Sequence, residues 1–173
     1  MHMKQFILSL SAVVALSTAA QAQSSSFCEG VHDVLKDAPN DYRNILGRMM
    51  ESTTSGTMWS STVKIPGVVG YRIVSAMGYF YEGAFIQTTD KNKLKPLYDE
   101  YTEKLKACLA PDGYKLSYQE NFIAGLSDFR KVIFMKDIKP GTDAKDLPPH
   151  VTMEALYNKD IGKFALVMFI FNH

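Results

Sequence analysis

The sequence predicts an α+β fold in which two helices pack on a mostly antiparallel sheet. Residues 94–109 carry apolar side chains at helical spacing, and several shorter runs rich in aromatic and β-branched residues are typical of strands. The composition, with 46% hydrophobic, 12% aromatic and 21% charged residues, is that of an ordinary globular domain. It excludes low-complexity disorder, since a disordered chain lacks so many aromatic residues.

Residues 1–22 have the three parts of a secretory signal peptide. A short basic start is followed by the apolar run Phe6 to Leu16 and by Ala20-Gln21-Ala22, which offers small residues to a signal peptidase. The apolar run is too short for a membrane span, because a spanning helix needs about 20 residues. We therefore expect cleavage after Ala22, and we expect residues 23–173 to form a single secreted or periplasmic α+β domain.

The mature chain is expected to be close to neutral and to lack a membrane span. Loss of Lys4 with the leader lowers the 19 Lys and Arg residues by one, to 18, against 18 Asp and Glu residues. A chain without net charge has no long-range field that draws it to nucleic acid, so no nucleic-acid partner is expected. The longest apolar segment of the mature chain, 164–171, is too short to cross a bilayer.

The two cysteines, Cys28 and Cys108, predict a disulfide. Export leads to an oxidising compartment, where a bridge is favoured over a catalytic thiol or a zinc site. Cys28 and His32 also have a spacing that could ligate a metal. Because the sequence indicates no further ligands for such a site, we assign no metal and no cofactor.

The first part of the mature chain predicts one helix, over residues 27–38. Cys28, Val31 and Leu35 recur at helical spacing until Pro39 interrupts the pattern. Residues 40–49 continue with apolar side chains at similar spacing, but Gly47 weakens a helix there, and we expect a helical turn or loop.

Three strands are expected next. Residues 59–65 alternate between apolar and polar side chains before Pro66-Gly67, which is the pattern of a strand with one wet face. Residues 71–76 and 79–87 form two further strands, and the short Met77-Gly78 connection between them predicts a hairpin.

The second half repeats the order of a helix followed by strands. The helix over 94–109 has apolar residues at offsets of three, four and seven, with charged residues between them. The last strand has no alternation, so we expect it in the interior of the sheet with both faces covered. The repeated order suggests a pseudo-duplicated helix-plus-strands unit. The strands expected in this half are 114–120, 129–136, 151–157 and 164–171.

Three features together resemble a type of small secreted bacterial α+β protein that carries two cysteines. They are Cys28 in the first helix, the segment Trp59-Ser60-Ser61 that opens a strand ended by Pro66-Gly67, and the helix from Tyr98 to Cys108-Leu109. The resemblance covers roughly residues 27–110. It implies bacterial export and the pairing of Cys28 with Cys108, and it carries no activity.

No catalytic residues are assigned, because no known catalytic pattern is present in the sequence. There is no G-x-S-x-G, and Gly67 and Gly70 lie at a predicted turn rather than at the start of a helix, where a phosphate would bind. One alternative stays open: a hydrolase whose carboxylates are brought together by the fold, with Glu82 and Glu120 as candidates.

Tyrosines on the predicted strands are the main indication of binding. Tyr71, Tyr79 and Tyr81, with Glu82 beside them, could form a contact surface, since a tyrosine ring offers rigid area with a polar tip. The competing interpretation is that these rings pack beneath the helices as sheet formers. We expect a non-catalytic binding or interaction domain for a protein or small-molecule partner. A further alternative is a carrier that holds an apolar ligand between sheet and helices.

Overall fold

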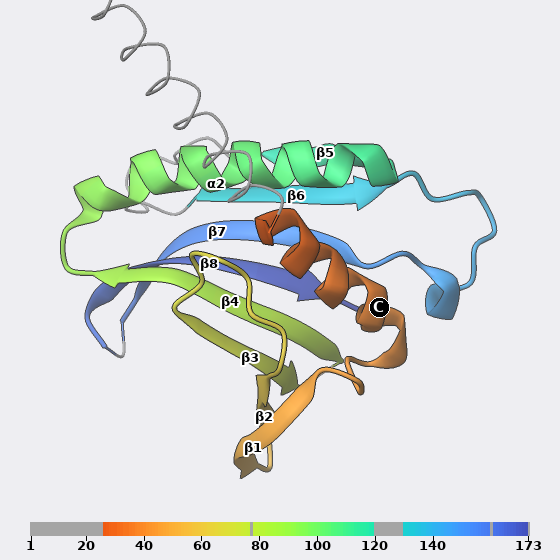
Figure 1. The fold of residues 1–173 in the computed structure, drawn as a ribbon, viewed down its shortest axis with the longest axis horizontal. Coiled ribbons are helices and arrows are strands. Elements are labelled where there is room, and N and C mark those ends of the chain that lie inside the picture. Colours follow the sequence, from red (N-terminus) through yellow and green to blue (C-terminus); the bar gives the residue numbers. More distant parts are fainter. Residues whose placement is uncertain (1–25, 77, 120–129, 160, 173) are drawn as a thin grey trace, which may run out of the picture.

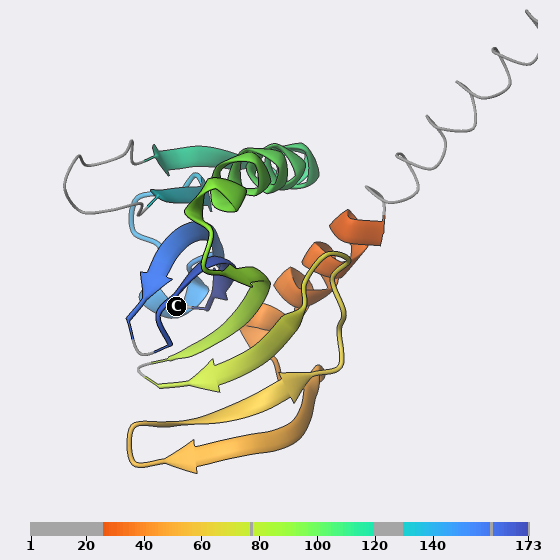
Figure 2. The same ribbon diagram turned by 90° about the vertical axis from the view of Figure 1, so that its left-hand side faces the viewer.

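The computed structural model describes residues 26–76, 78–119, 130–159 and 161–172. The predicted signal peptide, residues 1–22, and the candidate carboxylate Glu120 lie outside them. The described residues confirm the α+β class, because one eight-stranded antiparallel sheet carries two helices on one of its faces (Figures 1 and 2).

The sheet is built from two meanders that meet in its middle. The strand order is β1-β2-β3-β4-β8-β7-β6-β5, so each half of the chain supplies a helix and then four sequential strands. The halves join where β4 pairs antiparallel with β8. This order agrees with the predicted repetition of a helix-plus-strands unit. The strands are β1 Leu46–Thr53, β2 Gly56–Ser61, β3 Gly70–Ser75, β4 Tyr79–Thr88, β5 Tyr114–Gln119, β6 Arg130–Lys136, β7 His150–Asn158 and β8 Lys163–Phe171.

Alternate residues of the central strands form the core beneath the helices. On β8, Leu166, Met168 and Ile170 are completely buried, as the period of two in a strand requires for one face. Their cross-strand partners on β7 include Met153 and Val151, which are also completely buried. The prediction that this last strand lies in the interior of the sheet is confirmed, because β8 runs between β4 and β7.

The expectation that both faces of the last strand are covered is confirmed for part of its length. Both helices lie on one side of the sheet (Figure 2). On the other side Ala165 and Val167 are buried, whereas Phe169 and Phe171 are half-buried. The Phe80 ring centroid lies 6.0 Å from that of Phe169 and 5.4 Å from that of Phe171, and His150 stacks on Phe171. These rings shield one another on the face opposite the helices.

The two helices form at the places where the sequence predicts them. The N-terminal helix occupies residues 26–37, and α2 runs over Leu94–Leu109, the predicted bounds. The N-terminal helix buries Phe27, Val31 and Val34 against the sheet. It then tightens into the 3₁₀ turn η1, Ala38–Asn40, because Pro39 cannot continue an α-helix.

The segment 40–49 differs from the prediction in its second half. A turn follows η1, and its residues Asp41 and Tyr42 have positive φ angles of 53° and 59°. The Tyr42 side chain is completely buried, and its hydroxyl donates a hydrogen bond to the Ile170 carbonyl at 2.6 Å. This contact compensates for the uncommon backbone conformation. From Leu46 the chain is extended as β1, an edge strand rather than a helical turn.

The predicted strand 59–65 is displaced toward the N-terminus. The ladder of β2 covers Gly56–Ser61, and residues 62–65 leave the sheet. Ile65 is nonetheless buried, because it packs against the N-terminal helix at Gly30, where a Cβ would lie only 3.0 Å from the Ile65 side chain. In residues 62–65 the alternation of apolar residues therefore indicates burial beneath a helix, and it does not indicate pairing in the sheet.

The other predicted strands are confirmed, with ends that agree to within about one residue over the described ranges. The hairpin joins β3 and β4 in the expected place. Met77 of its connection lies outside the described residues.

The predicted disulfide between Cys28 and Cys108 is present. Its Cα atoms are 5.2 Å apart, within the usual range for a bridge. The bond joins the first turn of the N-terminal helix to the last turn of α2, and it closes 80 residues of sequence. It therefore fixes the two helices to each other on the face of the sheet that both cover.

Replacing both cysteines, by Cys28→Ser together with Cys108→Ser, should lower the free energy of unfolding by up to about 4 to 5 kcal/mol. The reason is the larger conformational entropy of an unfolded chain without the cross-link. Urea unfolding followed by circular dichroism measures the loss, and reduction of the unmodified protein should reproduce it. An unchanged midpoint in both cases would contradict the stabilising role.

Stability should fall in alkaline solution because of three buried phenols. Burial raises the pKa of Tyr42 and of Tyr81, and burial together with the Asp112 charge raises the pKa of Tyr114 to about 12. An unfolded tyrosine loses its proton near pH 10, so unfolding releases protons above that pH. The free energy of unfolding should be constant below about pH 9 and then fall by about 1.4 kcal/mol per pH unit for each phenol still protonated in the fold.

The variant Tyr81→Phe tests this pH dependence, because the Tyr81 hydroxyl is buried and has no hydrogen-bond partner among the described residues. It should make the alkaline decline shallower without destabilising the protein at neutral pH. Tyr157→Phe, on an exposed ring, is the matched control. An alkaline slope that is the same in all three proteins would refute the assignment.

Candidate functional site

The three tyrosines singled out from the sequence do not share one exposed surface. All three point to the face that the helices cover, and Tyr81 is completely buried in the core. Tyr71 and Tyr79 are half-buried and pack against the edge of the same core. Tyr79 also stacks with Trp59, at 6.3 Å between ring centroids. Binding by Tyr71 and Tyr79 stays a prediction, and each lines a different hollow.

Glu82 lies on the opposite face of β4, where Arg72 of β3 pairs with it. One guanidinium nitrogen, Nη2, lies 2.8 and 2.9 Å from the two carboxylate oxygens of Glu82. Both residues line a shallow hollow of about 230 Å³, together with Tyr71 and the exposed Met50. A carboxylate paired in this way is fixed in its orientation. Glu120, its proposed partner in a hydrolase, lies outside the described residues.

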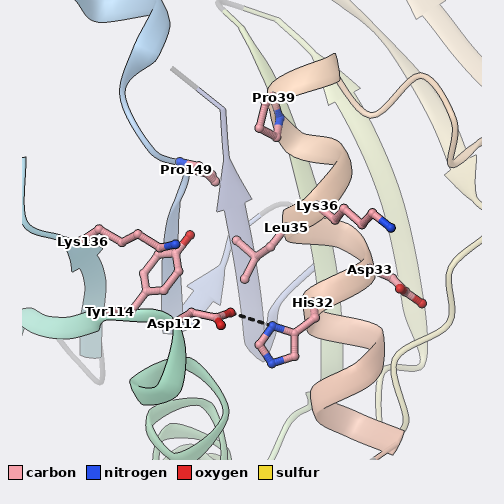
Figure 3. Close-up of a pocket in the computed structure, with 9 residues that line it drawn as sticks. All are labelled: His32, Asp33, Leu35, Lys36, Pro39, Asp112, Tyr114, Lys136 and Pro149. Carbon is pink, nitrogen blue, oxygen red and sulfur yellow. Dashed lines mark ion pairs between the residues drawn. The ribbon is translucent and has the colours of Figure 1, made fainter. Parts of the chain in front are cut away.

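A second pocket, of about 400 Å³, lies where the two helices end near β5 and β6 (Figure 3). Its walls come from separate parts of the chain: the N-terminal helix, the 3₁₀ turn η3 (Ala110–Asp112) that follows α2, the two strands, and the loop before β7. The tertiary structure alone brings these parts together. The lining residues are His32, Asp33, Leu35, Lys36, Pro39, Asp112, Tyr114, Lys136 and Pro149.

An imidazole and a carboxylate close one side of the pocket. His32 Nδ1 lies 2.9 Å from Asp112 Oδ2, so this nitrogen carries a hydrogen and donates it to the carboxylate. The contact fixes the orientation of the ring and leaves Nε2 as the ring nitrogen that can contact solvent or a ligand. Both side chains are about two-fifths exposed, at 39% and 43%.

A phenol and an ammonium form the facing side. Tyr114 begins β5 and is largely buried, and Lys136 ends β6 directly across the ladder from it. The Lys136 Nζ atom lies 4.8 Å from the centre of the Tyr114 ring, a cation–π contact. Burial, and then the charge of Asp112, raise the pKa of Tyr114 to about 12. The phenol therefore keeps its proton at neutral pH and can donate it in a hydrogen bond.

The lining of the pocket offers groups that can bind and orient a ligand, and among its nine described residues it has no serine, threonine or cysteine. The His32–Asp112 pair resembles the base of a hydrolytic triad only in its hydrogen bond, because no serine or threonine hydroxyl and no thiol accompanies it in the lining. The arrangement is suited to holding a polar ligand in a fixed orientation.

The pocket was not predicted, although the sequence contains a signal for it. His32 follows Cys28 by four positions, and Asp112 follows Cys108 by four. A disulfide between the cysteines therefore brings one imidazole and one carboxylate to the same neighbourhood. Tyr114 and Lys136 had no such signal, because their pairing depends on the register between β5 and β6.

A metal at the Cys28–His32 spacing has no thiolate to bind it here. The Cys28 sulfur is bonded to Cys108, and the imidazole of His32 is paired with Asp112. In residues 26–76, 78–119, 130–159 and 161–172, no three His, Cys, Asp or Glu side chains gather in a way that could hold a metal ion.

Comparison with protein-family models, with curated proteins and with solved structures finds no match for the chain. Over the described part of the chain, no helix has the length and apolar character that crossing a bilayer requires. The site is therefore interpreted from its own chemistry.

The His32–Asp112 contact should contribute little to stability. Both partners are more than a third exposed, and exposed pairs contribute about 0.2 to 1 kcal/mol. We expect His32→Ala, Asp112→Asn and the double variant to give a coupling energy in that range in a double-mutant cycle of urea unfolding. A coupling energy several times larger would mean that the pair serves the fold rather than the pocket.

Proposed function

We propose that this chain is a non-catalytic binding domain that holds a small molecule in the pocket lined by His32, Asp112, Tyr114 and Lys136. One observation carries the proposal: side chains from two helix ends and two strands converge on one hollow with polar groups and without a serine, threonine or cysteine. The volume of about 400 Å³ falls within the range of small-molecule sites.

The disulfide supports this choice of site over the other hollows. Cys28 and Cys108 each lie four residues before His32 and Asp112, so the bridge holds together the two segments that form this side of the pocket. Preorganised walls reduce the entropy cost of binding. The hollow beside Tyr71 and Glu82 lies instead at the junction of β3 and β4, away from the cross-link.

The alternatives weighed from the sequence have less support. A carrier of apolar ligands needs space between sheet and helices, but large side chains such as Phe27, Leu105 and Met168 fill that layer. A hydrolase built on Glu82 needs a second free carboxylate nearby, whereas Arg72 compensates the one that is described.

We further propose that the domain works outside the reducing interior of the cell. The leader-like residues 1–22 and the disulfide both favour a secreted or periplasmic location, since cytosolic thiols are kept reduced.

A fragment screen followed by ¹H–¹⁵N NMR tests the proposed site. Mixtures of small acids, amides, amines and alcohols are added to the labelled mature protein, residues 23–173. We expect shift changes that gather at His32, Tyr114 and Lys136, because these residues surround the pocket. Tyr114→Phe should weaken the hits, and the exposed Tyr157→Phe should not. Hits that gather on the open sheet face around Phe80 and Phe171, or no hits in the pocket, would refute the proposal.

A further inference from the structure

The charges of the pocket do not cancel locally. Asp112 accepts a hydrogen bond from His32 at 2.9 Å. Among the described residues no carboxylate pairs with Lys136, whose ammonium lies over the Tyr114 ring instead. Asp33 and Lys36 line the rim, and Figure 3 shows both side chains directed away from Tyr114 and Lys136. The interior therefore has one cation without a carboxylate partner.

The groups beside this cation donate hydrogen bonds rather than accept them. The phenol of Tyr114 keeps its proton at neutral pH, since its pKa is raised to about 12. A lysine ammonium has donors only, and a phenol readily donates. Two adjacent donors, one of them charged, are complementary to an anionic oxygen.

The remaining wall of the pocket is apolar. Leu35 and Pro39 come from the N-terminal helix and η1, and Pro149 faces them from the loop before β7 (Figure 3). An anion without an apolar part would leave these side chains in contact with water. A ligand that satisfies both walls has a negative group at one end and a hydrocarbon part at the other.

We infer that the ligand of this pocket is a small organic acid, whose carboxylate lies at Lys136 and Tyr114 and whose apolar part lies against Leu35, Pro39 and Pro149. The inference rests on the proposed binding function and specifies its ligand class. A doubly charged phosphate is disfavoured because the Asp112 carboxylate would repel it. Of the two lysines in the described lining, moreover, Lys36 is directed away from Tyr114 and Lys136 (Figure 3). An amine is disfavoured because Asp112 is already engaged by His32.

Three probes with one carbon skeleton separate these chemistries: 3-phenylpropionate, 3-phenylpropionamide and 3-phenylpropan-1-amine. Their affinities for the mature protein are measured by NMR titration at neutral pH and low salt. We expect the acid to bind about tenfold more tightly than the amide, since a charge-assisted hydrogen bond to Lys136 is lost in the amide. The amine should bind more weakly than either.

The variant Lys136→Met keeps the length of the side chain and removes its charge. It should reduce the affinity for the acid to that for the amide and leave the amide affinity unchanged. Lys115→Met is the matched control, because Lys115 lies on the adjacent position of β5 from Tyr114 and pairs with Asp137. It should leave the preference for the acid intact.

Equal affinities for acid and amide, or an acid preference that survives Lys136→Met, would overturn the ligand class. Tightest binding of the amine would overturn it as well and would identify Asp112 as the recognising group. If none of the three binds, the ligand class is also refuted. In each of these cases the fragment screen decides separately whether the pocket binds small molecules at all, so the two proposals can fail independently.

Discussion

The antiparallel ladder between β4 and β8 is the constraint on which the rest of the structure depends. It runs from the pair Phe80 and Phe171 to the pair Thr88 and Phe164, and it turns two four-stranded meanders into one sheet. Each meander alone would have an edge strand on both sides, and the outward backbone N–H and C=O groups of these strands would lack hydrogen-bond partners in the sheet. Joining them through their last strands satisfies two of these four edges and leaves β1 and β5 outermost.

This ladder also decides where the helices lie. Each helix precedes its own meander and covers that meander's inner face, so an antiparallel junction places both helices on the same side of the joined sheet. There the disulfide fixes the start of the N-terminal helix to the end of α2. The candidate pocket follows from the two constraints together, because His32 and Asp112 extend beyond the bridge, and the sheet supplies Tyr114 and Lys136 beneath them.

Much of the fold could be predicted because its signals are local. The helix Leu94–Leu109 has the predicted bounds, since its apolar spacing and the Pro111-Asp112-Gly113 stop lie within one segment. The strand β1 was not predicted, because its residues from Arg48 to Thr53 are all exposed and show no burial pattern. Its extended backbone comes from pairing with β2, an interaction that no local pattern encodes.

The candidate site, too, could be predicted from the sequence only in part. The sequence places the tyrosines on predicted strands, but it does not say which face the helices cover, and the covered face is the one that holds Tyr81. The sequence by itself determined both helices, most of the strands and the cysteine pairing, because periodicity and redox chemistry act within short segments or on single residue types. The tertiary structure decided which face is buried and which segments surround the pocket. Register and helix placement are set by long-range pairing, and that pairing is fixed only when the whole sheet forms.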